Sequence, residues 1–155
     1  MRKRKPKLRT IMPDPRFGDP MVTQFVNNMM FNGKKSKTYQ IFYDAMDLIQ
    51  EKTGEEPHEL WKKALNTAMP QVEVRSKRIG GATFQIPMQI RPDRKVSIAI
   101  KWLISYSRKR NEKSMAQRLA GEVLAAAKEE GAAVKKRIDV HKMADANKAF
   151  SHLRF

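Results

Sequence analysis

The chain has 155 residues, of which 32 are lysine or arginine and 16 are aspartate or glutamate, so its formal net charge is +16. This length fits one domain with a hydrophobic core and is short for two, and so large a positive excess favours a polyanion, nucleic acid first, as partner. The absence of cysteine excludes disulfides and thiolate sites, and no apolar run approaches the roughly 18 residues of a membrane span, so we expect a soluble cytoplasmic protein.

The first 18 residues are predicted to form a flexible basic arm. They hold seven basic side chains and three prolines, and they lack periodic apolar positions. We expect this arm to be disordered when free and to fold on a partner. Asp19 followed by Pro20 then predicts the start of a helix, whose apolar residues recur at helical spacing until Asn32 and Gly33 end it.

Two further helices are predicted before the middle of the chain. One begins near Ser36 and ends before Gly54, and the next extends from Pro57 to about Met69, where Pro70 closes it. Each carries a stripe of apolar residues on one face. These stripes predict a helical core shared with the first helix.

Residues 72–91 alternate between apolar and polar residues around a Gly-Gly pair, which predicts a β-hairpin. Matching the apolar faces of the two strands pairs Val72 with Ile90 and Val74 with Met88, and leaves a three-residue loop at 80–82. We therefore expect Glu73, Arg75 and Lys77 on the opposite face. A two-stranded hairpin is marginal alone, so its base should rest on the helices while its basic tip projects.

Three helices are predicted after the hairpin. Asp93 is expected to cap the first, Ser114 is expected to cap the second, which ends at Gly131, and the last covers roughly 133–149 with Val134, Ile138 and Ala144 on one face. The predicted fold is mainly α, with about six helices, one protruding two-stranded β-hairpin and the disordered basic arm. Residues 19–155 are expected to form a single helical domain.

The positive charge is concentrated in two segments. Residues 1–10 hold six basic and no acidic residues, and residues 74–118 hold twelve basic and two acidic ones, so these segments account for the whole net charge. Residues 39–71 carry six acidic and three basic residues. This asymmetry predicts a polyanion-binding side with the acidic stretch turned away from it, and we expect no compensating acid beside Arg91, Arg94 and Lys95.

Catalytic and metal-binding patterns are lacking. GKKSKT at 33–38 resembles the end of a phosphate-binding loop, but Asn28 stands where that motif needs glycine. The three histidines lack metal-ligand spacing. We therefore predict no catalytic residue, no metal and no cofactor. A DNA-binding nucleoid or regulatory protein is the main alternative to an RNA-binding protein, and an enzyme acting on RNA is a weaker third hypothesis.

Several long segments carry a family resemblance. PDPRFGDP, FNGKKSKTYQIFYDAM, VEVRSKRIGGATFQIPMQIRP, RKRNEKSMAQRLAGE and AAVKKRIDVHKMADANKAFSHLRF occur in this order. Over residues 11–155 the chain resembles the bacterial small-subunit ribosomal protein seven family. The resemblance implies a bundle of six helices with an extruded hairpin. It also implies a structural ribosomal protein that binds the 3′ major domain of small-subunit rRNA and nucleates assembly of the head, near the exit-site tRNA and the mRNA exit path.

The resemblance also implies partners and contact residues. The implied protein partners are small-subunit proteins nine and eleven. The residues implied to contact rRNA are Arg2, Lys3, Arg4, Lys5, Lys7, Arg9, Lys34, Lys35, Lys37, Arg75, Lys77, Arg78, Arg91, Arg94, Lys95, Arg108, Lys109, Arg110, Lys113 and Ser114. Those implied to approach the tRNA are Arg78, Gly80, Gly81 and Ala82. Asn111 stands where many relatives carry glycine, and we expect it to adopt a left-handed backbone.

Overall fold

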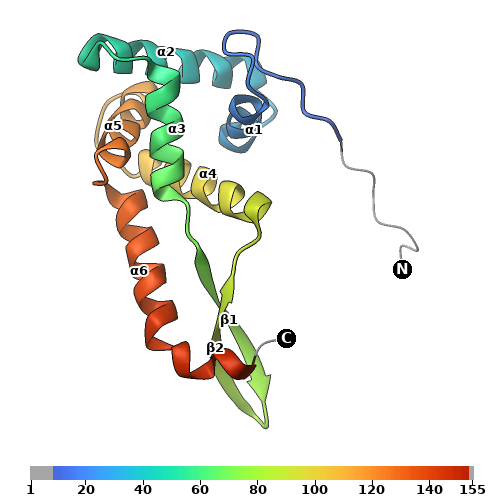
Figure 1. The fold of residues 1–155 in the computed structure, drawn as a ribbon. Helices are drawn as coiled ribbons and strands as arrows, with labels where there is room; N and C mark the ends of the chain where they lie inside the picture. The colour runs from blue at the N-terminus through green and yellow to red at the C-terminus, as the bar shows by residue number, and fades with distance from the viewer. Residues whose placement is uncertain (1–8, 154–155) are drawn as a thin grey trace.

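The computed structural model describes residues 9–153, which contain six α-helices, one β-hairpin and a final 3-10 helix (Figure 1). The predicted mainly α fold with a hairpin is confirmed. In chain order the elements are α1 (Pro20–Met29), α2 (Lys35–Thr53), α3 (Pro57–Ala68), β1 (Val72–Ile79), β2 (Ala82–Gln89), α4 (Pro92–Arg108), α5 (Met115–Ala127), α6 (Ala132–Ala146) and η1 (Lys148–Leu153). Among these helices, none has the length and apolar character needed to span a bilayer.

Local capping signals set most helix ends. Asp19 Oδ1 accepts a hydrogen bond from the Met21 N–H at 2.8 Å, and Ser114 forms a reciprocal capping box with Gln117. Gly54 ends α2 with φ +70°, a backbone conformation that glycine adopts without steric cost. The prediction for Asp93 was wrong: Arg91 occupies the N-cap of α4, because Pro92 already provides the first helical residue and places Asp93 inside the first turn.

The last two helices also differ from the prediction. Helix α5 ends at Ala127, three residues before Glu130, and Glu129 then has φ +62°. Helix α6 ends at Ala146, and η1, which the pattern did not predict, follows it. Ile138 is 41% exposed instead of facing the core with Val134 and Ala144.

Helices α1 to α5 enclose the core. Trp61 of α3 is fully buried, and the rings of Phe25 and Phe42 meet it edge-on with centroids 5.6 and 5.7 Å away. Aromatic pairs in this geometry add favourable electrostatics to the hydrophobic gain. The core is therefore a rigid block from which the loops and the hairpin extend.

The end of the predicted arm contacts this block. Asp14 is 2% exposed, and its carboxylate accepts hydrogen bonds from the backbone of Arg16 and Phe17 and from the hydroxyl of Tyr43. The Phe17 ring stacks on His58 with centroids 5.0 Å apart. Residues 14–17 thus pack on α2 and α3. The disorder predicted for the start of the arm concerns residues 1–8, which lie outside the described residues.

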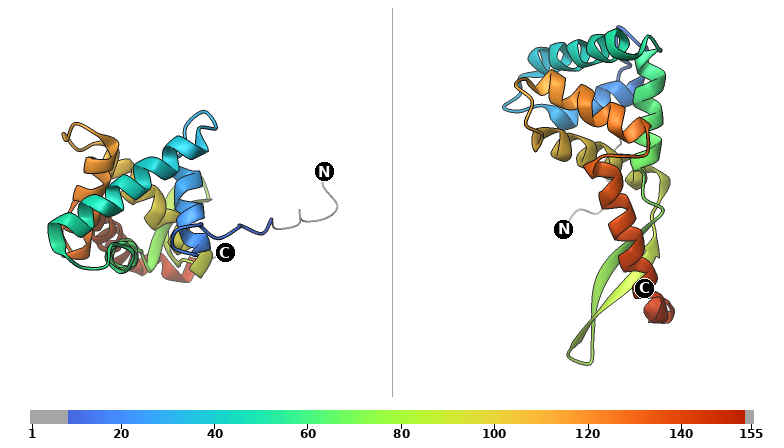
Figure 2. Two further views of the ribbon diagram at one scale, coloured as in Figure 1. Left: turned by 90° about the horizontal axis from the view of Figure 1, so that it is seen from above. Right: turned by 90° about the vertical axis from the view of Figure 1, so that its left-hand side faces the viewer.

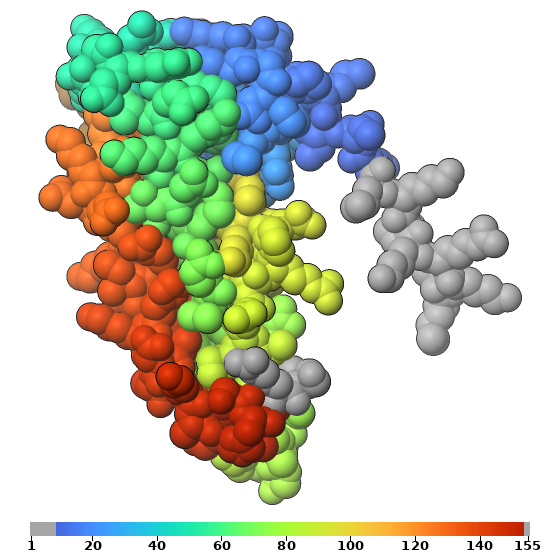
Figure 3. Space-filling view, in the orientation of Figure 1, coloured from blue at the N-terminus to red at the C-terminus, as the bar shows by residue number. Residues whose placement is uncertain are grey.

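The hairpin extends away from the helical block beside α6 (Figures 1 and 2). Helix η1 lies across it, where Phe150 packs on Phe84 of β2 with ring centroids 5.3 Å apart and the Lys77 ammonium donates to the Leu153 carbonyl. In the space-filling view the tip protrudes below η1 (Figure 3). The hairpin thus has a supported base and a projecting tip, as predicted. The structure adds a support by η1 near the middle of the hairpin, which was not predicted.

The predicted hairpin register was wrong by one residue. Val72 pairs with Gln89, Val74 pairs with Pro87, and a two-residue Gly80-Gly81 turn closes the ladder. Both glycines have positive φ, +57° and +90°, which is the turn geometry whose twist matches that of paired strands. As a result, the polar residues of β1 share a face with the apolar residues of β2. The pairs are Glu73 with Met88, Arg75 with Ile86 and Lys77 with Phe84.

Candidate nucleic-acid interface

Three lysines crowd the N-terminus of α2. Lys34 is the N-cap residue and makes no capping hydrogen bond with its side chain, and Lys35 and Lys37 lie in the first turn, which contains no acidic residue. All three are exposed. The N-terminal end of a helix carries partial positive charge, so cations there are unfavourable unless an anion is present.

An arginine and an exposed aromatic ring meet beside these lysines. The Arg108 guanidinium, at the end of α4, donates to the Met29 carbonyl at 2.9 Å and lies 4.0 Å from the centroid of the Phe31 ring. Partial burial lowers the pKa of Arg108. Phe31 is 65% exposed, which is unusual for an aromatic residue of a stable helical protein. The sequence reasoning missed Phe31, although an aromatic residue directly before a basic Gly-containing loop was a usable signal.

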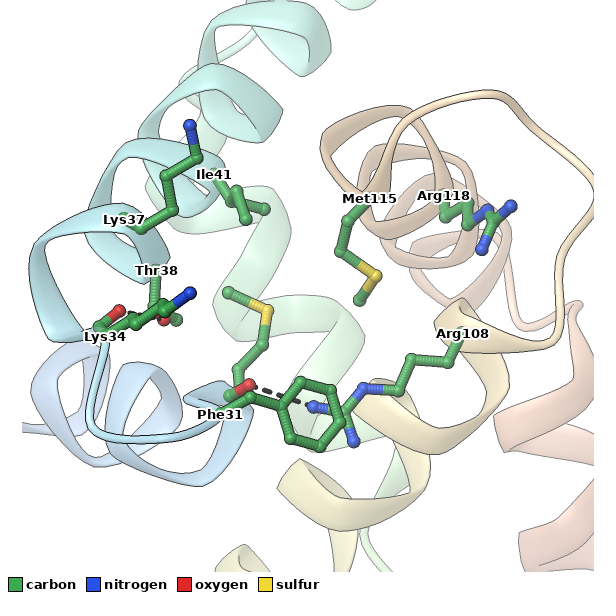
Figure 4. A pocket seen from close by; sticks show the side chains of 9 residues that line it. Phe31, Lys34, Lys37, Thr38, Ile41, Arg108, Met115 and Arg118 are labelled. Atoms are coloured by element: carbon green, nitrogen blue, oxygen red, sulfur yellow. Dashed lines mark hydrogen bonds between the residues drawn. The ribbon is translucent and has the colours of Figure 1, made fainter.

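A pocket of about 370 Å³ opens between α2 and the junction of α4 with α5 (Figure 4). Its lining includes the apolar side chains of Met29, Ile41 and Met115. Lys34 and Lys37 extend from α2 on one side, whereas Arg108 and Arg118 extend from α4 and α5 on the other. Arg118 was not among the predicted contact residues. The pocket thus combines an apolar lining with four cations.

The loop between α4 and α5 contains predicted contact residues in different states. Arg110 forms ion pairs with Glu112 at 2.8 Å and with the buried Glu122 at 3.1 Å. Burial alone would lower the pKa of Arg110, but these two carboxylates raise it. Lys109 and Lys113 are exposed. Arg110 is therefore engaged within the protein, whereas the Lys109 ammonium lies 5.2 Å from the centroid of the Tyr106 ring and Lys113 is exposed.

Ser114 and Asn111 belong to the same loop between α4 and α5. The Ser114 hydroxyl accepts a hydrogen bond from the Gln117 N–H, so its capping role is confirmed and its RNA contact stays a prediction. Asn111 does not adopt the expected left-handed backbone: among described residues other than glycine, positive φ occurs at Asn32 and Glu129. The hydrogen bond from Arg118 Nε to the Glu112 carbonyl holds this loop in its shape.

The base of the hairpin carries a second group of cations. Arg75 and Arg94 both pair with Glu73, so the expectation that no acid compensates this cluster was wrong. The acid lies 21 residues before Arg94, so the charge of the neighbouring residues did not reveal this pair. Lys95 donates to the Gln71 side chain, and Arg91 is exposed.

The hairpin tip contains the residues predicted to approach tRNA. Arg78, Gly80, Gly81 and Ala82 are all exposed. No hydrogen bond or ion pair joins residues 78–83 to the helices in the part of the chain that the structure describes. The tip is thus accessible to a partner.

The predicted contact residues form groups at both ends of α4 rather than one compact patch. Arg94 lies in its first turn and Arg108 in its last, and a helix of 17 residues is about 25 Å long. In the right-hand view of Figure 2, the α1–α2 loop, the α4–α5 loop and the hairpin tip lie toward one side, opposite α3 and α6. Arg9 is exposed, and the remaining arm residues lie outside the described residues: Arg2, Lys3, Arg4, Lys5 and Lys7.

The acidic stretch lies at the other end of α2 from the lysines. Glu55, Glu56 and Glu59 are exposed near the turn from α2 to α3. Lys62, a basic residue within this stretch, forms an ion pair with Asp19, which also contacts His58. Within residues 9–153, no group of three or more histidine, aspartate or glutamate side chains could hold a metal ion.

Exposed cations on loops and on an extended hairpin, presented by a rigid helical body, are features of proteins that bind nucleic acids. The family model described as "Ribosomal protein S7p/S5e" matches residues 1–148. The "Small ribosomal subunit protein uS7" of Flavobacterium psychrophilum is 67% identical and that of Christiangramia forsetii 69% identical, in both cases over the full length of both chains. The chain belongs to the S7p/S5e family of ribosomal proteins, which are structural proteins rather than enzymes. The family resemblance drawn from the sequence is confirmed.

Proposed function

We propose that this protein is a component of the small ribosomal subunit in the cytoplasm that binds the 3′ major domain of the rRNA and nucleates assembly of the head. In this proposal the hairpin tip lies near the exit-site tRNA and the mRNA exit path. Small-subunit proteins nine and eleven are its proposed neighbours. The contact surface consists of the α2 N-terminus, the α4–α5 loop, the hairpin and the arm.

The strongest support comes from the N-terminus of α2. Three lysines at this end oppose the helix dipole, and no acidic side chain of the first turn compensates them. Such an arrangement lowers the stability of the free protein, and an RNA phosphate placed there would relieve the repulsion. The three lysines therefore reduce the stability of the free helix, and residues that reduce stability in this way are expected at binding sites.

The pocket beside these lysines supports RNA in particular. Specific RNA recognition uses unstacked bases of loops and junctions, which stack on aromatic or guanidinium planes. The exposed Phe31 ring and the Arg108 guanidinium provide such planes, and the surrounding cations suit the flanking phosphates. An intact DNA duplex keeps its bases stacked and would leave the apolar lining of the pocket uncovered.

The proposal is tested by a salt titration of binding to the isolated 3′ major domain of small-subunit rRNA, with tRNA and random duplex DNA as competitors. Neutralised phosphates release counterions, so affinity should fall steeply with salt, by about 0.7–0.9 in the log–log slope per contact. A preference for the rRNA that persists at moderate salt supports the proposal. Equal competition by duplex DNA at every salt concentration would favour a general nucleoid protein instead.

Shortening the hairpin tip should separate its role from rRNA binding. Replacing residues 78–83 by a two-residue Asn-Gly turn keeps the Lys77–Phe84 pair and its contacts with η1. We expect thermal stability to stay close to wild type, rRNA affinity to fall by no more than the one contact implied for Arg78, and the retention of exit-site tRNA by reconstituted subunits to decrease. Loss of the folded state would show that the tip supports the fold, and unchanged tRNA retention would contradict its proposed role.

A further inference from the structure

Glu73 holds two arginines that come from different elements. Its carboxylate oxygen Oε1 accepts from Arg75 Nε at 2.7 Å, and Oε2 accepts from Arg94 Nε and forms an ion pair with Arg94 Nη2, both at 3.0 Å. Arg75 lies on β1 and Arg94 in the first turn of α4. One carboxylate therefore fixes the relative orientation of the hairpin cation and the helix cation.

The pairing leaves part of each arginine accessible. The Glu73 side chain is 15% exposed, whereas those of Arg75 and Arg94 are 48% and 54% exposed. A guanidinium has five N–H donors, and these hydrogen bonds use only the Nε–H of each arginine. The three side chains, with Arg91 and Met88, line a hollow of about 360 Å³ at the base of the hairpin.

Glu73 is ionised at neutral pH in this position. Burial alone would raise its pKa, but the hydrogen bonds and charges of Arg94 and Arg75 hold the pKa below its usual range. A permanent negative charge beside an RNA-binding surface repels phosphate, so charge alone gives no binding advantage. The advantage must come from geometry, since two long side chains that are ordered in advance lose less conformational entropy when they bind.

We propose that Glu73 is a positioning residue, which holds Arg75 and Arg94 so that they and Arg91 form a phosphate-binding cradle at the base of the hairpin. This inference rests on the proposed function for its ligand, an RNA phosphate. Three arginines and one carboxylate leave the cradle with a net charge of about +2 near neutral pH. A planar guanidinium held at one edge presents its remaining donors in a fixed direction, which suits phosphate oxygens.

The test is the direction in which one substitution changes the affinity for rRNA. Glu73→Gln removes a negative charge of the surface, so simple electrostatics predicts tighter binding to the 3′ major domain rRNA. The proposal predicts weaker binding, by roughly fivefold at 0.2 M salt, with a log–log salt slope smaller by about 1 because ordered phosphate contacts are lost. The control Asp93→Asn removes an exposed negative charge one residue from Arg94. Asp93 forms no ion pair with any residue of 9–153, so this variant should bind the rRNA at least as tightly as wild type.

A spectroscopic readout in the free protein tests the positioning directly. Arginine Nε–H protons that hydrogen-bond to a carboxylate exchange slowly with water, so ¹⁵N NMR should show protected Nε–H signals for Arg75 and Arg94 in wild type and in Asp93→Asn. These signals should lose protection in Glu73→Gln. Unchanged protection would overturn the proposal, and so would rRNA binding by Glu73→Gln that equals or exceeds wild type.

Two further outcomes remain decisive. If Glu73→Gln does not fold, Arg94→Lys replaces it, since this variant keeps the charge and loses the Nε–H hydrogen bond and the planar guanidinium. Weaker rRNA binding by Arg94→Lys then supports the proposal, and unchanged binding overturns it. If wild type itself shows no preference for rRNA, the proposed function fails, whereas the NMR protection in the free protein still decides whether Glu73 orders the two arginines.

Discussion

Replacing Glu122 with alanine is expected to lower the free energy of unfolding by about 3–5 kcal/mol, the usual cost of removing one partner from a buried ion pair. Glu122 is 1% exposed. Its carboxylate accepts from the Ala133 N–H at 2.9 Å, at the start of α6, and from Arg110 Nη1 at 3.1 Å. The substitution leaves both donors without this acceptor and also removes buried methylene groups. Urea denaturation of the purified protein measures the change.

Two variants show which part of this loss belongs to the buried contact. Glu122→Gln keeps an acceptor for the Ala133 N–H and loses the charge, so its destabilisation should be smaller, about 1–3 kcal/mol. Asp139→Ala removes an exposed carboxylate from α6 and should change stability by less than about 0.5 kcal/mol. A Glu122→Ala value close to that of Asp139→Ala would contradict the structural role assigned to this glutamate.

Local chemistry explains why the helices could be predicted. Asp19 with Pro20, Gly54 and the capping box at Ser114 each act within a few residues, so a single sequence reveals them. The hairpin register could not be read in this way. Face matching favoured a three-residue loop, but the turn preference of Gly80-Gly81 prevailed, and contacts with η1, an element absent from the pattern, support the resulting strand faces.

The candidate interface was predictable in its location and less so in its details. Segment charge correctly indicated a loop whose lysines are exposed, as at Lys109 and Lys113. It could not show every internal partner of these cations, because several of the partners are distant in sequence. Arg110 bonds to a carboxylate 12 residues away, Arg94 to one 21 residues away, and Arg108 to a carbonyl 79 residues away.

Replacing the three lysines at the start of α2 by alanine should weaken rRNA binding and stabilise the free protein at the same time. The salt slope should become smaller by about 2, and affinity at 0.2 M salt should fall by roughly tenfold to fiftyfold, because up to three phosphate contacts are lost. Stability should rise by about 0.3–1 kcal/mol, since like charges are removed from the positive end of the helix dipole. Filter binding and urea denaturation on the same samples measure both effects. The variant carries Lys34→Ala, Lys35→Ala and Lys37→Ala.

A charge-matched triple variant provides the control for this experiment. Lys52, Lys63 and Lys128 are exposed and lie at the far end of α2, on α3 and at the end of α5. Their replacement by alanine lowers the net charge by the same amount, so a general polyanion binder would lose affinity equally in both variants. A contact surface at the α2 N-terminus predicts that the control keeps nearly all of its affinity and slope. Because the α2 variant is expected to lose binding while gaining stability, unfolding could not account for its loss, and equal losses in the two variants would show that binding depends on net charge alone.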